Sequence, residues 1–285
     1  MISNKQFQNE LEIIIKNAIR EDIGPGDYSS LACIPETATG KARLLVKDDG
    51  IIAGVDFAKM VFKEIDKDLK IDVKIPDGNF VRYGDVAFYI EGKSQSILKA
   101  ERLVLNAIQR MSAIATKTNK YVKILEETNT KILDTRKTTP GIRALEKWAV
   151  RIGGGTNHRF GLYDMVMLKD NHIDFAGGIE QAIIKTNDYL KKNNLNLNIE
   201  IETRNLDEVK EVLRIGKVTR VMLDNFNYED LRMAVKLING KFETEASGGI
   251  TEKTLLKYAQ CGVDYISSGA LTHSVYNMDF SLKAI

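Results

Sequence analysis

The spacing of apolar residues predicts a helix at the start of the chain. One helical face would carry Phe7, Leu11, Ile14, Ile15 and Ala18, which recur at the three- and four-residue intervals of an amphipathic helix. This helix should end at Gly24-Pro25-Gly26, because neither residue type favours its continuation.

A second, longer helical pattern runs from about Gln95 to Glu127. Its apolar stripe consists of Ile97, Val104, Ile108 and Met111. Arg102 lies off that stripe and by itself indicates a solvated helix residue. Between the two helices, the runs KARLLVK, LKIDVKI and DVAFYIEG predict short strands, with turns at Asp49-Gly50 and Asp77-Gly78. We therefore expect a small α+β domain, with the long helix bridging it to a second domain.

From residue 131 onward the pattern changes to short apolar runs separated by helical segments. These runs are KILDT, MVMLK, NIEIE, RVMLD, FETEAS and DYISS. Repeated β/α units predict a parallel sheet that closes or nearly closes into a barrel, with its functional groups at the carboxyl ends of the strands. Polar residues lie where this predicts, namely Asp134, Arg136, Lys169, Glu202, Asp224, Ser247 and Ser268. Six units are visible rather than eight, so we expect an incomplete barrel.

Composition narrows the function classes. The chain has 285 residues, of which 44% are hydrophobic and 28% charged, and its formal net charge is +2. This charge gives no global field for nucleic acid or for an anionic membrane surface, so we expect neither partner. No apolar run is long enough to span a membrane, and we expect a cytoplasmic protein. Cys33 and Cys261 lack metal-type spacing, so both are expected to be buried free thiols.

Positive charge is concentrated in one segment of this nearly neutral chain. Residues 134–172 bring Arg136, Lys137, His158, Arg159 and Lys169 around glycine-rich turns. Buried cations are costly without a partner, so this excess predicts a site for a polyanion.

The same segment resembles the quinolinate phosphoribosyltransferase family. The resemblance lies in DTRKTTPGIRALEKWAV, GGGTNHRFGL and LKDNHI, and it extends to EDIGPGD, AERLVLN, LDNF, ASGGIT and GALTH. It implies an N-terminal α+β sandwich domain over residues 1–112, followed by an open six-stranded α/β barrel over 113–272, with the tail 273–285 packing back on the first domain. It also implies transfer of phosphoribose from 5-phosphoribosyl-1-pyrophosphate (PRPP) to quinolinate with decarboxylation, a step of NAD biosynthesis.

PRPP loses pyrophosphate in this reaction, and Mg²⁺ suits that step because it prefers one or two carboxylates together with phosphate oxygens. Glu202 and Asp224 supply such a pair, while Glu200 points to the same side as Glu202 by strand alternation and leaves the assignment between these two open. The resemblance implies that PRPP is held by Lys137, Thr138, Glu202, Asp224, Ser247, Gly248, Gly249, Ser268 and Gly269. Thr138 or Thr139 could instead cap the following helix. Glycine turns after the last strands also suit a phosphate.

Quinolinate carries two adjacent carboxylates, which planar guanidinium groups bind through paired hydrogen bonds. Arg136 and Arg159 fit this role, and Lys169 and His158 can hold the remaining charge. Arg102 matches a family arginine that enters the neighbouring subunit's site, so the resemblance implies a homodimer with a composite site and leaves higher assembly open. We expect Lys169, Glu202 and Asp224 to be catalytic. After N-glycosylation the ring nitrogen is an electron sink, so no organic cofactor is needed.

Two alternatives stay open at this point. A related enzyme could use another acceptor, such as nicotinate or a molybdenum-linked substrate, although the two carboxylate-binding arginines argue against it. A non-catalytic sensor of phosphate ligands has no need for the acid pair Glu202 and Asp224. His172 and His273 are interpreted as structural.

Overall fold

A computed structural model describes residues 3–285 as two compact units. The parallel-sheet unit comprises residues 120–136 and 155–270, and the antiparallel-sheet unit comprises residues 3–119, 137–154 and 271–285. Within residues 3–285, no helix combines the length and the apolar character that crossing a membrane requires.

The antiparallel-sheet unit is built on a four-stranded sheet of order β12-β1-β5-β3. Its strands are β1 (Thr39–Val46), β3 (Lys70–Val73), β5 (Val86–Lys93) and β12 (Phe280–Ala284), and a separate pair is formed by β2 (Gly50–Ile51) and β4 (Phe80–Val81). The three strands predicted from the sequence are confirmed as β1, β3 and β5. Gly50 lies in β2 rather than in the predicted turn, whereas Gly78 has a φ of +88° and does lie in one.

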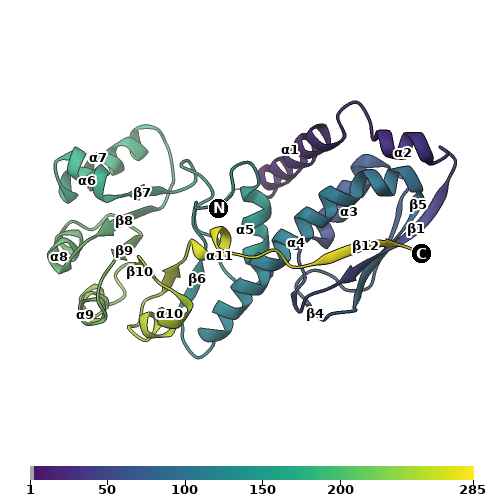
Figure 1. Cartoon of the computed structure of the whole chain (residues 1–285). Coiled ribbons are helices and arrows are strands. Elements are labelled where there is room, and N and C mark those ends of the chain that lie inside the picture. Colours follow the sequence, from purple (N-terminus) through teal and green to yellow (C-terminus); the bar gives the residue numbers. More distant parts are fainter. Residues whose placement is uncertain (1–2) are drawn as a thin grey trace. The chain divides into compact units, whose positions relative to one another are not determined.

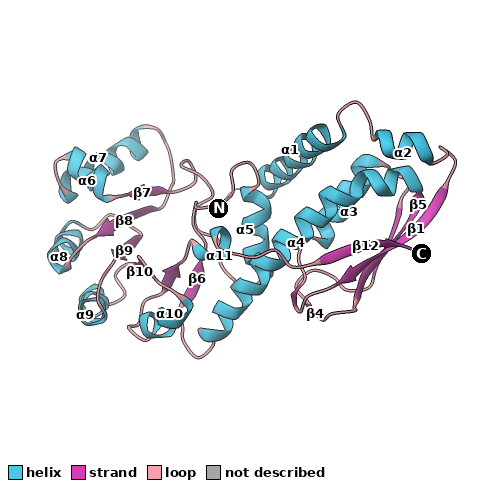
Figure 2. Cartoon of the chain, in the orientation of Figure 1, coloured by secondary structure: helices cyan, strands magenta, loops and turns pink. Residues whose placement is uncertain are grey.

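Helices accompany the antiparallel sheet in this unit, and α3 lies beside the sheet (Figure 2). They are α1 (Asn4–Ile23), α2 (Tyr28–Cys33), α3 (Val55–Ile65), the first part of α4 (Ser94–Ile124), α5 (Arg143–Ile152) and the short α11 (Ala270–His273). The predicted apolar stripe of α4 is buried, and Arg102 is exposed. Phe57 and Phe62 of α3 are buried with Phe88 of β5, so the core of this unit lies between helix and sheet.

The parallel-sheet unit contains the six predicted β/α strands, in the order β6-β11-β10-β9-β8-β7. They are β6 (Lys131–Leu133), β7 (Val166–Leu168), β8 (Ile199–Thr203), β9 (Arg220–Asp224), β10 (Glu243–Ser247) and β11 (Tyr265–Ser267). The helices of this unit are α6 (Asp170–Ala176), α7 (Ile179–Lys192), α8 (Leu206–Ile215), α9 (Tyr228–Ile238) and α10 (Glu252–Ala259), and α7 to α10 follow one another along one side of the sheet (Figure 1). The predicted fold class, an α+β domain and an open parallel α/β barrel, is confirmed.

The two compact units differ in extent from the predicted domains, whose boundary at residues 112–113 stays a prediction. Residues 113–119 and 137–154 belong to the antiparallel-sheet unit. The reason is local packing, since Trp148 of α5 makes an edge-to-face contact with Phe7 of α1 at 5.7 Å between ring centroids. β12 pairs with β1 from Ala42 to Val46, and this pairing ties the C-terminal segment into the same unit.

The cysteines only partly match the expectation. Both are free thiols, and Cys261 is buried, but Cys33 is exposed. Cys33 ends α2, a six-residue helix whose buried residue is Ser30, so no core covers its thiol.

Candidate active site

Two acidic side chains and one lysine gather at the carboxyl ends of β7, β8 and β9. Glu202 is the penultimate residue of β8, Asp224 ends β9, and Lys169 directly follows β7. The Lys169 Nζ lies 3.6 Å from Oε2 of Glu202. Burial raises the pKa of Glu202, the Lys169 ammonium opposes this rise, and the negative charge of Asp224 adds to it. Glu202 and Asp224 are therefore near enough to repel one another, which is the arrangement that a cation would stabilise.

The ends of β9 and β10 are joined through Asn225. Its backbone N–H donates to the carbonyl of Ser247 at 2.9 Å, and its side-chain Nδ2 donates to Oδ2 of Asp224 at 2.6 Å. Gly248 follows with a φ of +96°, and a Cβ at that position would collide with the Asn225 amide. A close backbone approach therefore requires glycine at residue 248.

Two further predicted phosphate-binding residues follow β11. The backbone N–H of Ser268 donates to the carbonyl of Leu133 at 3.0 Å, which fixes the turn that contains Ser268 and Gly269 against the end of β6. Gly249 also has a positive φ, of +58°, but no atom lies near its missing Cβ. The residues predicted for PRPP in this unit thus all lie at the carboxyl edge of one sheet.

Arg136 and Arg159 form a pair of like charges in the same unit. Arg136 is exposed, whereas Arg159 is buried and donates through Nη1 to the carbonyl of Met165 at 3.2 Å. Burial lowers the pKa of Arg159, and the positive charge of Arg136 lowers it further. Two guanidinium groups that repel one another favour an anion with two binding groups.

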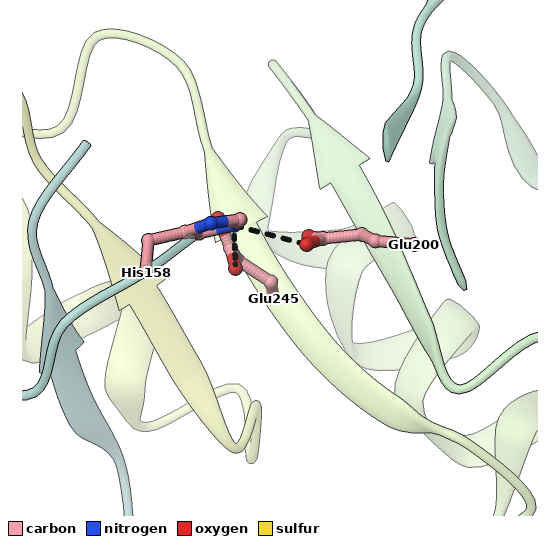
Figure 3. Close-up of side chains that lie close together, drawn as sticks. All are labelled: His158, Glu200 and Glu245. Atoms are coloured by element: carbon pink, nitrogen blue, oxygen red, sulfur yellow. Dashed lines mark ion pairs between the residues drawn. The ribbon is translucent and has the colours of Figure 1, made fainter. Parts of the chain in front are cut away.

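The loop that carries His158 and Arg159 is held by Asp134, which the sequence placed at a strand end without a specific role. Asp134, directly after β6, is fully buried and accepts hydrogen bonds from the His158 backbone N–H at 2.8 Å and from Asn157 Nδ2 at 2.5 Å. His158 is itself buried, and its Nε2 is directed at Glu200 and Glu245 (Figure 3). Glu200 thus lies with His158, while Glu202 lies with Lys169.

His172 has a structural contact, as expected. Its Nδ1 accepts the backbone N–H of Lys169 at 3.0 Å at the start of α6. This bond fixes the backbone from which the Lys169 side chain projects.

The other three predicted site residues belong to the antiparallel-sheet unit. They are Arg102 on α4, and Lys137 and Thr138 in the segment before α5. The Thr138 hydroxyl accepts a hydrogen bond from Nε of Arg143 at 2.9 Å, so it is engaged at the start of α5. The carbonyl of Lys137 accepts the hydroxyl of Thr272 at 2.8 Å.

A buried carboxylate that the sequence analysis did not single out holds this segment. Glu146 of α5 is fully buried and accepts from Arg110 Nη2 at 2.8 Å and from the backbone N–H and the hydroxyl of Thr139 at 3.0 and 2.8 Å. Thr139 is thus bonded to a side chain within α5. The sequence did contain a signal for this contact, because an acidic residue one turn into a helix that follows Thr-Thr-Pro is placed to accept hydrogen bonds at the start of that helix.

Two family models match the chain, and both describe domains of quinolinate phosphoribosyl transferase. The model of the quinolinate phosphoribosyl transferase N-terminal domain matches residues 27–112, and the model of the C-terminal domain of the same family matches residues 114–283.

Individual relatives agree with this assignment. The chain is 48% identical to a chloroplastic nicotinate-nucleotide pyrophosphorylase (carboxylating) of Arabidopsis thaliana, over 96% of this chain and 82% of that protein. It is 41% identical to a probable enzyme of the same name from Bacillus subtilis, over 96% and 93% of the two chains. The solved structure of nicotinate-nucleotide pyrophosphorylase from Francisella tularensis superposes with a TM-score of 0.90 at 38% identity, covering 100% of this chain and 98% of that one. Residue pattern, fold and relatives therefore agree that the chain belongs to the quinolinate phosphoribosyltransferase family.

Proposed function

We propose that this chain transfers the phosphoribosyl group of PRPP to quinolinate with loss of CO₂, yielding nicotinate mononucleotide and pyrophosphate. Family membership supports the reaction. The main structural support is that one unit contains both the arginine pair Arg136 and Arg159 and the acid pair Glu202 and Asp224. The first pair suits a dicarboxylate, and the second suits a cation bound to pyrophosphate.

The reaction needs charge neutralisation and alignment more than covalent catalysis. The bond from the ribose C1 to pyrophosphate breaks, and a bond from C1 to the pyridine nitrogen forms. The carboxylate next to that nitrogen then leaves as CO₂, its electron pair stays on the ring carbon beside the positive nitrogen, and that carbon takes up one proton. No electrons leave the system, so no redox cofactor is required.

We assign quinolinate to the cationic residues of the site. Arg136 and Arg159 bind the two carboxylates, and Lys169, whose side chain is half-exposed beside Glu202, faces the charge that remains. A substrate with one carboxylate would leave part of the like-charge repulsion between the two guanidinium groups uncompensated. This difference favours quinolinate over nicotinate as the acceptor.

We assign PRPP to the strand ends and to the segment before α5. Glu202 and Asp224 would hold Mg²⁺ together with the substrate, because their oxygens are the donors that this ion prefers. The ion, when bound, neutralises the leaving pyrophosphate. The turns at Ser247 to Gly249 and at Ser268 and Gly269 receive the phosphate through backbone N–H groups, and Lys137 and Thr138 add side-chain contacts.

The assembly is the last part of the proposal. Arg102 is exposed on α4, and we assign it to the site of a second copy in a homodimer. The cytoplasmic location expected from the sequence stays a prediction.

The test is CO₂ release from quinolinate labelled at its 2-carboxylate, with purified protein, PRPP and Mg²⁺. We expect release that requires all three components and stops with a chelator, and no pyrophosphate production when nicotinate replaces quinolinate. Pyrophosphate release with nicotinate but not with quinolinate would overturn the choice of acceptor. Binding of PRPP without turnover and without dependence on Mg²⁺ would instead support a sensor.

A further inference from the structure

Beneath the proposed site, four ionisable side chains lie together inside the parallel-sheet unit. Glu200 and Glu245 are both fully buried, His158 is 7% exposed, and Arg220 extends from the first residue of β9. Nε2 of His158 lies 2.9 Å from Oε2 of Glu200 and 3.4 Å from Oε2 of Glu245 (Figure 3). Nη1 of Arg220 lies 3.1 Å from Glu245 and 3.9 Å from Glu200. We call these residues the His158 cluster.

Strand register places the His158 cluster one layer below the catalytic acids. Glu200 precedes Glu202 by two residues on β8, and Glu245 precedes Ser247 by two residues on β10, so each pair shares one face of the sheet. Arg220 is paired in register with Glu200 on one neighbouring strand and with Glu243 on the other. The cluster therefore lies on the face that carries the site, nearer the amino ends of the strands.

Both ring nitrogens of His158 are engaged. Nδ1 accepts the backbone N–H of Arg159 at 2.7 Å, and Nε2 faces the carboxylates of Glu200 and Glu245. A nitrogen that accepts carries no proton, so the ring proton is on Nε2 and points to the two acids. Both ring nitrogens therefore face groups of the protein itself, and the binding role that the sequence suggested for His158 stays a prediction.

Two opposing influences act on the charge state of His158. Burial lowers the pKa of His158, but the nearby carboxylates of Glu200 and Glu245 outweigh burial and raise it to about 9. A doubly protonated ring would turn Nδ1–H toward the Arg159 N–H at 2.7 Å, with two donors facing each other and no acceptor. The two carboxylates favour a second proton on the ring, but the contact at Nδ1 leaves no place for it, so the ring that fits the observed contacts is neutral with its proton on Nε2.

We propose that Glu200 and Glu245, held in place by Arg220, are positioning residues for quinolinate. They fix the tautomer and the orientation of the His158 ring, and through Nδ1 they fix the backbone of Arg159, whose guanidinium group receives a carboxylate of the substrate. This inference rests on the proposed function, because it takes Arg159 as a contact of quinolinate. Second-layer partners of this kind orient a ligand-binding group without touching the ligand.

The test compares two substitutions on β10. Glu245→Gln keeps the side-chain volume but replaces a carboxylate with an amide that can turn a donor toward Nε2–H. Glu243→Gln is the matched control, because Glu243 binds the same Arg220 at 2.9 Å but is exposed and is not among the His158 contacts. Both variants are checked for folding by circular dichroism, and KM and kcat are measured for each substrate.

We expect Glu245→Gln to raise the KM for quinolinate by on the order of tenfold, while its KM for PRPP stays within about twofold. Glu243→Gln should leave both KM values within about twofold. An unchanged KM for quinolinate in a folded Glu245→Gln protein, or an equal rise in both KM values, would overturn the proposal.

A second measurement needs no enzymatic activity. The wild-type chain has three histidines, and with nitrogen-15 histidine labelling the signal of His158 is the one retained after His172→Gln and His273→Gln are made in turn. We expect a single tautomer with the proton on Nε2. Averaged nitrogen shifts from two exchanging tautomers would refute the His158 cluster as a positioning device, whether or not CO₂ is released. Loss of CO₂ release with the expected tautomer would refute the proposed reaction and leave the cluster in place.

Discussion

At the scale of single residues, the site depends on like charges held close together until a ligand separates them. The Arg136 charge lowers the pKa of Arg159, and the Asp224 charge raises the pKa of Glu202. The repulsion within each pair is unfavourable when no ligand is bound, so each pair favours binding of an ion of the opposite sign. The chemistry of the substrate and of the cation can therefore be inferred from which charges the fold brings together.

The arginine pair gives the first prediction. Arg136→Ala and Arg159→Ala should each raise the dissociation constant for quinolinate about tenfold to a hundredfold, which corresponds to about 1.4 to 2.8 kcal/mol. Loss of one guanidinium leaves one carboxylate of the substrate without a paired partner. The dissociation constant for PRPP should change by less than about threefold, as measured by titration calorimetry.

Arg151→Ala is the control, because Arg151 is exposed in the last turn of α5. It should change neither constant. If Arg136→Ala weakened the binding of quinolinate and of PRPP equally, the role assigned to Arg136 would be wrong.

Glu146 gives a second prediction at this scale. Glu146→Ala should lower the free energy of unfolding by about 3 to 5 kcal/mol, because it leaves Arg110 and the Thr139 N–H without their buried acceptor. The segment with Lys137 and Thr138 should loosen, so PRPP binding should weaken in whatever fraction stays folded. Chemical denaturation measures the first effect and calorimetry the second.

Asp72→Ala is the matched comparison, since Asp72 pairs with Lys74 at 2.8 Å but has a side chain that is 62% exposed. Water already solvates that carboxylate, so the unfolding midpoint should not move. A shift as large as that of Glu146→Ala would show that burial is not what gives Glu146 its importance.

At the scale of elements, the sequence predicted the strands of the parallel sheet and the polar residues at their ends, because both depend on local hydrophobic periodicity. All six parallel strands were expected at runs such as NIEIE and RVMLD, and the polar residues after them lie at one edge of the sheet. Apolar runs bounded by turns carry this information locally. The helix α3 was not expected, although its buried residues Val55, Ala58, Val61 and Phe62 recur at helical spacing.

Contacts between distant residues could not be predicted in the same way. Arg220 begins a strand and Glu245 lies within another, and nothing in either run indicates that Arg220 and a buried histidine both contact Glu245. Asp134 was placed at a strand end, but its bond to the His158 N–H depends on a loop that returns after more than twenty residues. Contacts of this kind depend on the tertiary fold, and local sequence patterns do not indicate them.

The turn after β10 gives the prediction at this scale. Gly248→Ala should destabilise the protein and weaken PRPP binding more than Gly249→Ala does. Both glycines have a positive φ, of +96° and +58°, so both substitutions carry backbone strain, but only at residue 248 would the added Cβ meet the Asn225 amide.

Displacement of Asn225 would also disturb its bond to Asp224. Thermal unfolding and the dissociation constant for PRPP provide the measurement, with Gly249→Ala as the internal reference. Equal effects of the two substitutions would show that positive φ alone, and not the close approach, sets the requirement for glycine.

At the scale of the whole molecule, the residues assigned to one reaction come from two compact units. Lys169, Glu202 and Asp224 belong to the parallel-sheet unit, while Arg102 and Lys137 belong to the antiparallel-sheet unit. Family membership was predictable from motifs that run through both units, and the family models match both. The sequence offers no physical signal for a second copy, because Arg102 by its position alone is a solvated residue of α4.

The proposed homodimer therefore needs a test that does not depend on size measurements. Arg102→Ala and Lys169→Ala should each be inactive when purified alone, and mixing them under conditions that allow subunit exchange should restore activity. A hybrid dimer contains two sites, and if Arg102 acts in the partner's site, one of them combines wild-type Arg102 with wild-type Lys169. Random exchange in an equal mixture makes half of the dimers hybrid, so recovery should approach about a quarter of wild-type activity.

The control for this experiment is a mixture of two variants whose substituted residues lie in the same unit. Mixing Lys169→Ala with Asp224→Asn should restore no activity if both residues serve the site of their own chain, because each site of a hybrid dimer then lacks one of the two residues. In that arrangement a hybrid of two same-chain variants keeps each defect in its own site. Recovery with Arg102→Ala but not with Asp224→Asn would locate Arg102 in the partner's site, whereas no recovery in either mixture, with exchange demonstrated by differently tagged chains, would place Arg102 in the site of its own chain.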